Sequence, residues 1–95
     1  MPFVKAITKL ADGIEVDTSF LGSATITSAS IPSTSQGSLA DVDAFIRQLI
    51  AGWIATSMPD GFDGSYDIRV NSFAPGALDF DLVISDDPNV SIADY

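Results

Sequence analysis

The sequence predicts a two-layer α+β domain, in which one amphipathic helix at about residues 38–57 packs on an antiparallel sheet of about five strands. Apolar and polar residues alternate in segments before and after that helix, which is the period of half-buried strands. Within the helix, apolar residues recur at spacings of three and four. The element order β-β-β-α-β-β gives both apolar surfaces a partner, because one helix can cover one face of a sheet.

The first predicted hairpin joins residues 3–10 to residues 14–20. The second segment alternates strictly, and Asp12-Gly13 is a strong turn signal. A two-residue loop would place lysine within the apolar face, so we prefer a three-residue loop over residues 11–13. The pairs that this loop predicts are Leu10 with Ile14, Thr8 with Val16, and Lys9 with Glu15 on the outer face.

The third predicted strand covers residues 23–31, and a loop follows over residues 32–37. Residues 18–40 carry no charge, but eleven of these 23 residues are Ser or Thr. A segment this polar does not predict a membrane-spanning helix.

Ser38 is the predicted N-cap of the helix, because its hydroxyl can accept a hydrogen bond from the backbone N–H of Asp41. Met58-Pro59 is predicted to end the helix, since the residue before a proline disfavours helical backbone. We expect burial of the apolar stripe on the sheet to stabilise the helix. The stripe comprises Leu39, Val42, Phe45, Ile46, Leu49, Ile50, Trp53 and Ile54.

Residues 65–71 and 77–84 are predicted to form a second hairpin, because both segments alternate apolar and polar residues. With a five-residue connection, the predicted pairs are Val70 with Leu78, Ile68 with Phe80, Tyr66 with Leu82, Arg69 with Asp79, and Asp67 with Asp81. Two facing aspartates can share a proton, as an acid–base dyad does. Both would point outward on their strands, so we interpret them as a solvated face.

The segment from Asp60 to Asp67 contains three carboxylates and two glycines, a composition that can surround a calcium ion. Its spacing does not match an EF-hand loop, and position 71 is Asn where a late bidentate Glu is required. The sequence leaves cation binding here open. We interpret the segment as an ordinary acidic turn and predict no metal site.

The residue content argues against several classes of function. The chain has no histidine and no cysteine, and no glycine-rich segment resembles a phosphate-binding loop. A Ser–Lys pair would need Lys5 or Lys9, both predicted on the solvent side of a strand. A net charge of −9 repels nucleic acids and anionic membranes. We therefore predict no catalytic residues, no cofactor, and no nucleic-acid or membrane partner.

The side of the helix opposite the apolar stripe is small rather than charged. Its C-terminal half carries Ala51, Gly52 and Ala55, which would let another surface approach closely. The alternative is a helix buried on all sides within its own domain. We predict these three residues as part of an interface.

Residues 1–87 are predicted to form one domain, followed by a tail at residues 88–95. Val90, Ile92 and Tyr95 make the tail apolar enough to dock on a partner, for example as an added strand. The alternative is a loosely ordered terminus.

These features predict a noncatalytic structural or interaction module, either a homo-oligomer or a small subunit of a larger protein assembly such as a virion or tail. The alternative is an acidic inhibitor or mimic that binds a basic site on another protein through residues 60–87. The N-terminus shows no signal peptide, so we expect a cytoplasmic location or one within an assembled particle.

Overall fold

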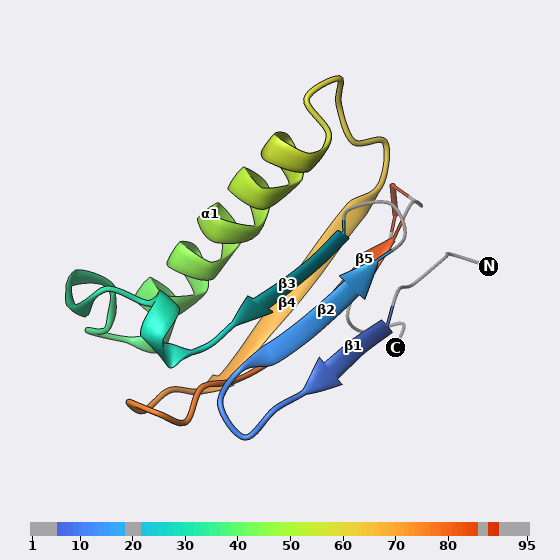
Figure 1. Ribbon diagram of the computed structural model, residues 1–95. Coiled ribbons are helices and arrows are strands. Elements are labelled where there is room, and N and C mark those ends of the chain that lie inside the picture. The colour runs from blue at the N-terminus through green and yellow to red at the C-terminus, as the bar shows by residue number, and fades with distance from the viewer. Residues whose placement is uncertain (1–5, 19–21, 86–87, 90–95) are drawn as a thin grey trace.

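Figure 1 shows the computed structural model, which describes residues 6–18, 22–85 and 88–89. The predicted α+β class and the order β-β-β-α-β-β are confirmed. The strands of these residues form two antiparallel sheets, β1-β2-β3 and β4-β5, where the sequence analysis expected one. The elements are β1 (Ala6–Lys9), β2 (Ile14–Thr18), β3 (Gly22–Ile26), the 3-10 helices η1 (Ser28–Ser30) and η2 (Ser33–Ser35), α1 (Leu39–Ser57), β4 (Ser65–Ser72) and β5 (Asp79–Ser85).

Helix α1 begins and ends where the sequence predicts. The Ser38 hydroxyl accepts a hydrogen bond of 3.2 Å from the backbone N–H of Asp41. Met58 is the C-cap, and its backbone N–H donates to the carbonyl of Ile54. One turn on the exposed side is held by Arg47, whose Nε donates to Asp43 at 2.7 Å.

One hydrophobic core is shared by α1 and both sheets. The helix contributes Val42, Ile46, Ile50 and Ile54, at the spacing of a single helical face. Leu39, the first residue of the predicted stripe, is 46% exposed and lies outside this core. The strands and loops contribute Ile14, Val16, Ile26, Ile31, Ile68, Leu78, Phe80, Leu82 and Ile84.

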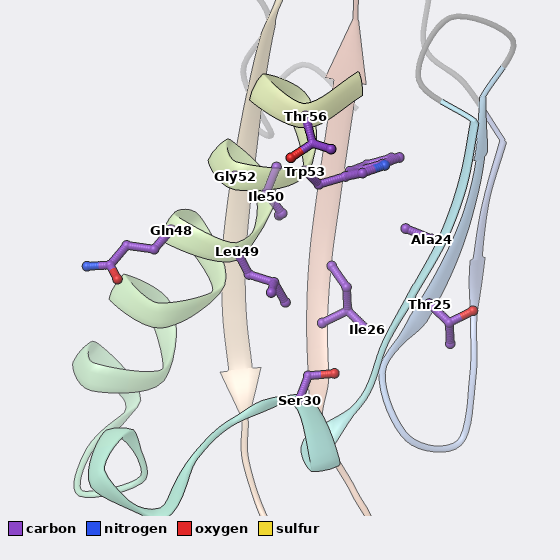
Figure 2. A pocket seen from close by; sticks show the side chains of 10 residues that line it. All are labelled: Ala24, Thr25, Ile26, Ser30, Gln48, Leu49, Ile50, Gly52, Trp53 and Thr56. Carbon is purple, nitrogen blue, oxygen red and sulfur yellow. The ribbon is translucent and has the colours of Figure 1, made fainter. Parts of the chain in front are cut away.

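The two sheets and the helix enclose the core from three sides. In the close view of Figure 2, α1 and the β1-β2-β3 sheet lie on opposite sides of the space that the labelled side chains line, and β4 and β5 run behind it. Helix α1 is tied to β4 by two hydrogen bonds of 3.2 Å, from Arg47 Nη2 to the carbonyl of Ile68 and from the Tyr66 hydroxyl to the carbonyl of Arg47. Among the described residues, β3 pairs on one edge only, and residues of β3 and of the helix border the same open side of the core.

The predicted register of the first hairpin is wrong by one residue. The structure pairs Ile7 with Val16 and Lys9 with Ile14, so the loop has four residues and Leu10 is 40% exposed. The cause is tertiary: the Gly13 N–H donates to the carbonyl of Leu78 rather than closing the hairpin. Contacts made by the turn with the rest of the chain therefore set the register of this hairpin.

The third predicted strand is shorter than expected and ends at Ile26. The chain then turns into η1, because Asp12 accepts hydrogen bonds from both the backbone N–H and the hydroxyl of Ser28, at 3.0 and 2.8 Å. Ser28 is buried and its hydroxyl also accepts from the N–H of Gly76 at 2.8 Å. Because of these contacts, Ser28 does not continue the pairing of β3 with β2.

The second hairpin keeps the predicted faces but shifts by two residues. Ile68 pairs with Leu82, and a β-bulge follows the pair of Val70 with Phe80. Arg69, rather than Asp67, lies opposite Asp81, and Val83 lies opposite Asp67. The predicted facing aspartates are therefore not paired, and the acid–base dyad considered from the sequence does not form.

Candidate interaction surface

The three predicted interface residues of the helix are exposed and adjacent. Ala51, Gly52 and Ala55 lie on the C-terminal half of α1, and we refer to them as the helix ridge. The space beside Gly52 is open, since a Cβ added there would meet nothing within 4 Å. The helix is therefore not buried on all sides by the described residues. The other predicted interface residues, Val90, Ile92 and Tyr95, lie outside the described residues.

On one side of the ridge lies a cleft of about 570 Å³ between α1 and β3, which we call the β3 cleft. In Figure 2, Leu49, Ile50 and Trp53 extend from the helix toward the side of β3 that carries Ala24 and Ile26. Ile50 and Ile26 are buried, whereas Leu49 and Trp53 are only partly buried. The remaining lining residues are Thr25, Ser30, Gln48, Gly52 and Thr56.

On the other side of the ridge lies a second cleft of similar volume, about 570 Å³, which we call the loop cleft. It lies between the end of α1 and the segment that leads into β4. It is lined by Ala51, Ile54, Ala55, Met58, Pro59, Gly61, Phe62, Gly64, Ser65 and Tyr66.

The linings of the two clefts are uncharged, although exposed Asp60 and Asp63 are neighbours in the chain of the loop-cleft residues Gly61, Phe62 and Gly64. No residue that lines either cleft is Asp, Glu, Lys or Arg. Such a surface offers apolar contact and neutral hydrogen-bonding groups, and its lining has no titratable acid or base apart from the Tyr66 hydroxyl. The small residues of the ridge are visible in the sequence. The β3 side of the β3 cleft, however, depends on a contact between distant segments, which no local sequence pattern predicts.

The sequence also missed a cluster of charged groups where β1 meets β5. Lys9 Nζ donates to Asp79 at 2.6 Å, to Asp81 at 3.0 Å and to the carbonyl of Phe80 at 2.6 Å. Partial burial lowers the pKa of Lys9, but the hydrogen bonds and charges of the two aspartates outweigh it, so the pKa lies above its ordinary value. Lys9 thus bridges the two sheets while its side chain stays 45% exposed, and its partner across the hairpin is Ile14 rather than the predicted Glu15.

Asp81 is the centre of this cluster. Hydrogen bonds from Asn71 at 3.0 Å, from Lys9, and from Arg69 at 2.9 Å lower the pKa of its carboxyl to about 2. Asp81 is therefore a firmly ionised structural group, and its proton is not available near neutral pH. This cluster stabilises the fold and does not suit acid–base chemistry.

The acidic segment from Asp60 to Asp67 is a connecting loop as far as Gly64, and its last three residues belong to β4. Asp67 Oδ1 lies 3.9 Å from Arg47 Nη2, an ion pair that draws it toward the helix. Across the described residues, no three acidic side chains are grouped closely enough to hold a metal ion. The turn consequently offers no assembled ligand set.

Family models, curated proteins and solved structures were compared with the chain, and none matches it. In the described part of the chain, no helix is both long and apolar enough to cross a bilayer.

Proposed function

We propose that the protein is a noncatalytic interaction module that assembles with copies of itself or serves as a small subunit of a larger protein assembly. The observation that carries the proposal is the uncharged surface of the helix ridge and its two flanking clefts. On a chain of net charge −9, this surface is where another acidic or neutral protein can approach with least repulsion. Half-buried Trp53 offers the aromatic area that interfaces use as an anchor.

The internal ion pairs of Asp79 and Asp81 favour this proposal over an acidic inhibitor or mimic. The structure describes three cations, Lys9, Arg47 and Arg69, and each forms an ion pair with at least one aspartate of the same chain. Asp79 and Asp81, which belong to the acidic segment of residues 60–87, both form ion pairs with Lys9 of the same chain. A mimic would present its carboxylates to a basic partner instead.

A virion or tail is one assembly that suits a short, acidic chain with no cysteine, and we include it in the proposal as the narrower assignment. The cytoplasm or the interior of an assembled particle is the matching location. Protein is the partner class, without a cofactor, nucleic acid or membrane.

The test is the molar mass in solution, measured by size-exclusion chromatography with light scattering at micromolar to millimolar concentration. We expect a dimer or larger species, and Ala55→Glu should reduce its population at least tenfold by placing charge on the ridge. Ala44→Glu is the matched control, because Ala44 is exposed on the same helix but lines neither cleft.

Salt separates the two candidate functions. Assembly through the uncharged surface should persist or strengthen from 50 to 500 mM salt, since screening weakens repulsion between acidic copies. Binding of an acidic mimic to a basic site weakens over the same range. A monomer at millimolar protein and 500 mM salt would overturn self-assembly.

A further inference from the structure

The β3 strand has an open edge that borders the β3 cleft. Among the residues that the structure describes, β3 pairs with β2 alone. Thr25 is exposed on this strand, and Ala24, Thr25 and Ile26 line the cleft. An edge of this kind presents backbone N–H and C=O groups to any extended segment that reaches it.

The hairpin geometry identifies which backbone groups point outward from β3. The N–H of Leu10 donates to the carbonyl of Gly13, so the neighbouring pair of Lys9 with Ile14 is not hydrogen-bonded within the hairpin. Since successive residues of a strand direct their N–H and C=O groups to opposite sides, those of Ile14 point toward β3.

The same alternation continues across the sheet. In β2, Ile14, Val16 and Thr18 face β3 with their backbone groups, and their partners are Ile26, Ala24 and Gly22. The intervening residues of β3, Ser23 and Thr25, therefore direct their N–H and C=O groups to the open edge. Two residues with two groups each can form four hydrogen bonds with a further strand.

The edge lacks the features by which proteins prevent edge-to-edge pairing. Such strands usually carry lysine, another charge, or proline. The β3 sequence Gly-Ser-Ala-Thr-Ile contains none of these, and residues 18–40 around it carry no charge at all. Two copies of net charge −9 can thus bring these segments together without charged side chains meeting in the strand pair.

We propose that β3 pairs antiparallel with β3 of a second copy of this chain, about a two-fold axis midway between the two Ala24 residues. This inference rests on the proposed function and names its contact. Full overlap of the five-residue strands sets Ser23 opposite Thr25 of the second copy, so the four outward backbone groups of each strand are matched. Ala24 lies opposite Ala24 of the second copy, in the closely spaced type of pair.

A second copy fits this edge for two reasons. The pairing is self-complementary, as an interface with two-fold symmetry requires. Five paired residues form a small contact, and the adjoining β3 cleft and helix ridge supply further apolar area beside the axis.

Cysteine cross-linking tests the register directly, because the chain has no cysteine and any disulfide between protein cysteines of a single-cysteine variant must join two copies. In a glutathione redox mixture, Ala24→Cys should form a covalent dimer at the protein concentrations at which the wild type associates. Facing residues of a closely spaced pair have Cα atoms about 4.5 Å apart, within reach of a disulfide. Thr25→Cys is the control, since its side chain is on the other face and is diagonal to its copy, about 7–8 Å away.

Thr25→Pro tests the backbone bonds. Proline removes the outward N–H of Thr25 and leaves the ladder with β2 intact, as edge strands tolerate. We expect the dissociation constant of the dimer to rise at least tenfold for Thr25→Pro and to stay unchanged for Thr25→Val. Circular dichroism checks that both variants fold.

The outcomes separate this inference from the proposed function. A wild-type dimer that Ala55→Glu disrupts but Thr25→Pro does not, with no Ala24→Cys cross-link, overturns β3 pairing and leaves self-assembly standing. A wild-type monomer that binds another protein through the same edge also overturns it. A monomer in every condition overturns both β3 pairing and self-assembly.

Discussion

The carboxylate of Asp12 accepts a hydrogen bond of 2.9 Å from the backbone N–H of Leu78, a residue 66 positions further along the chain. The same carboxylate accepts two hydrogen bonds from Ser28. The first hairpin turn is thereby joined to η1 and to the start of β5. These hydrogen bonds, led by the one from Leu78, lower the pKa of Asp12, although desolvation opposes them.

Asp12→Ala should lower the midpoint of urea unfolding clearly, because it leaves the N–H groups of Ser28 and Leu78 without their acceptor. Asp12→Asn should lower it less, since the amide oxygen still accepts. The control is Glu15→Ala, which removes an exposed carboxylate from β2. Equal midpoints for Asp12→Ala and Glu15→Ala would show that the Asp12 bonds do not stabilise the fold.

Gly13→Ala should destabilise the protein by more than about 3 kcal/mol, since strain and steric overlap act together. Gly13 has φ +87°, and a Cβ there would lie 1.8 Å from the carbonyl oxygen of Ile26. Gly22→Ala is the matched comparison, with φ +80° and nothing within 4 Å, and should cost only about 1 kcal/mol. Urea unfolding measures both, and similar losses would contradict the close approach at Gly13.

The pKa of Asp81 predicts how acid acts on the fold. Its carboxyl titrates near 2 in the folded protein and near 3.8 when unperturbed. A depressed pKa contributes stability that is fully present above about pH 4 and is lost as the pH falls toward 2. NMR titration of the Asp81 side-chain carbon should show the low midpoint, and Asn71→Ala should raise it because the largest stabilising bond is removed. A midpoint near 4 in the wild type would contradict the cluster.

Ser38→Ala should destabilise the protein by about 1 kcal/mol, because the N–H of Asp41 loses its capping acceptor. Ser57→Ala, at the exposed far end of α1, is the control and should change stability by less than about 0.5 kcal/mol. Thermal or urea unfolding of both variants gives the comparison. A loss for Ser57→Ala as large as that for Ser38→Ala would argue against capping.

The sequence predicted the elements that depend on local signals. Ser38 and Met58-Pro59 define the ends of α1, and the alternation after residue 64 predicted the second hairpin. These features succeed because capping, proline geometry and side-chain period act within a few residues.

Register could not be predicted, since it depends on contacts between distant segments. The bonds of Asp12 to Ser28 and Leu78 lengthen the first turn and end β3 at Ile26. In the second hairpin, a two-residue shift preserves the apolar face, so alternation alone cannot distinguish the two registers. The small residues of the helix ridge can be read from the sequence, whereas the β3 cleft depends on how the β1-β2-β3 sheet lies against α1.

The junction around Asp12 also bears on how quickly the chain folds. It unites a turn at residue 12 with residues 28 and 76–78, so it forms only after the long intervening segment has been closed. Contacts of such high sequence separation slow folding relative to helix or hairpin formation. The amides of Ser28 and Leu78 should therefore acquire protection from hydrogen exchange later in refolding than those in the middle of α1.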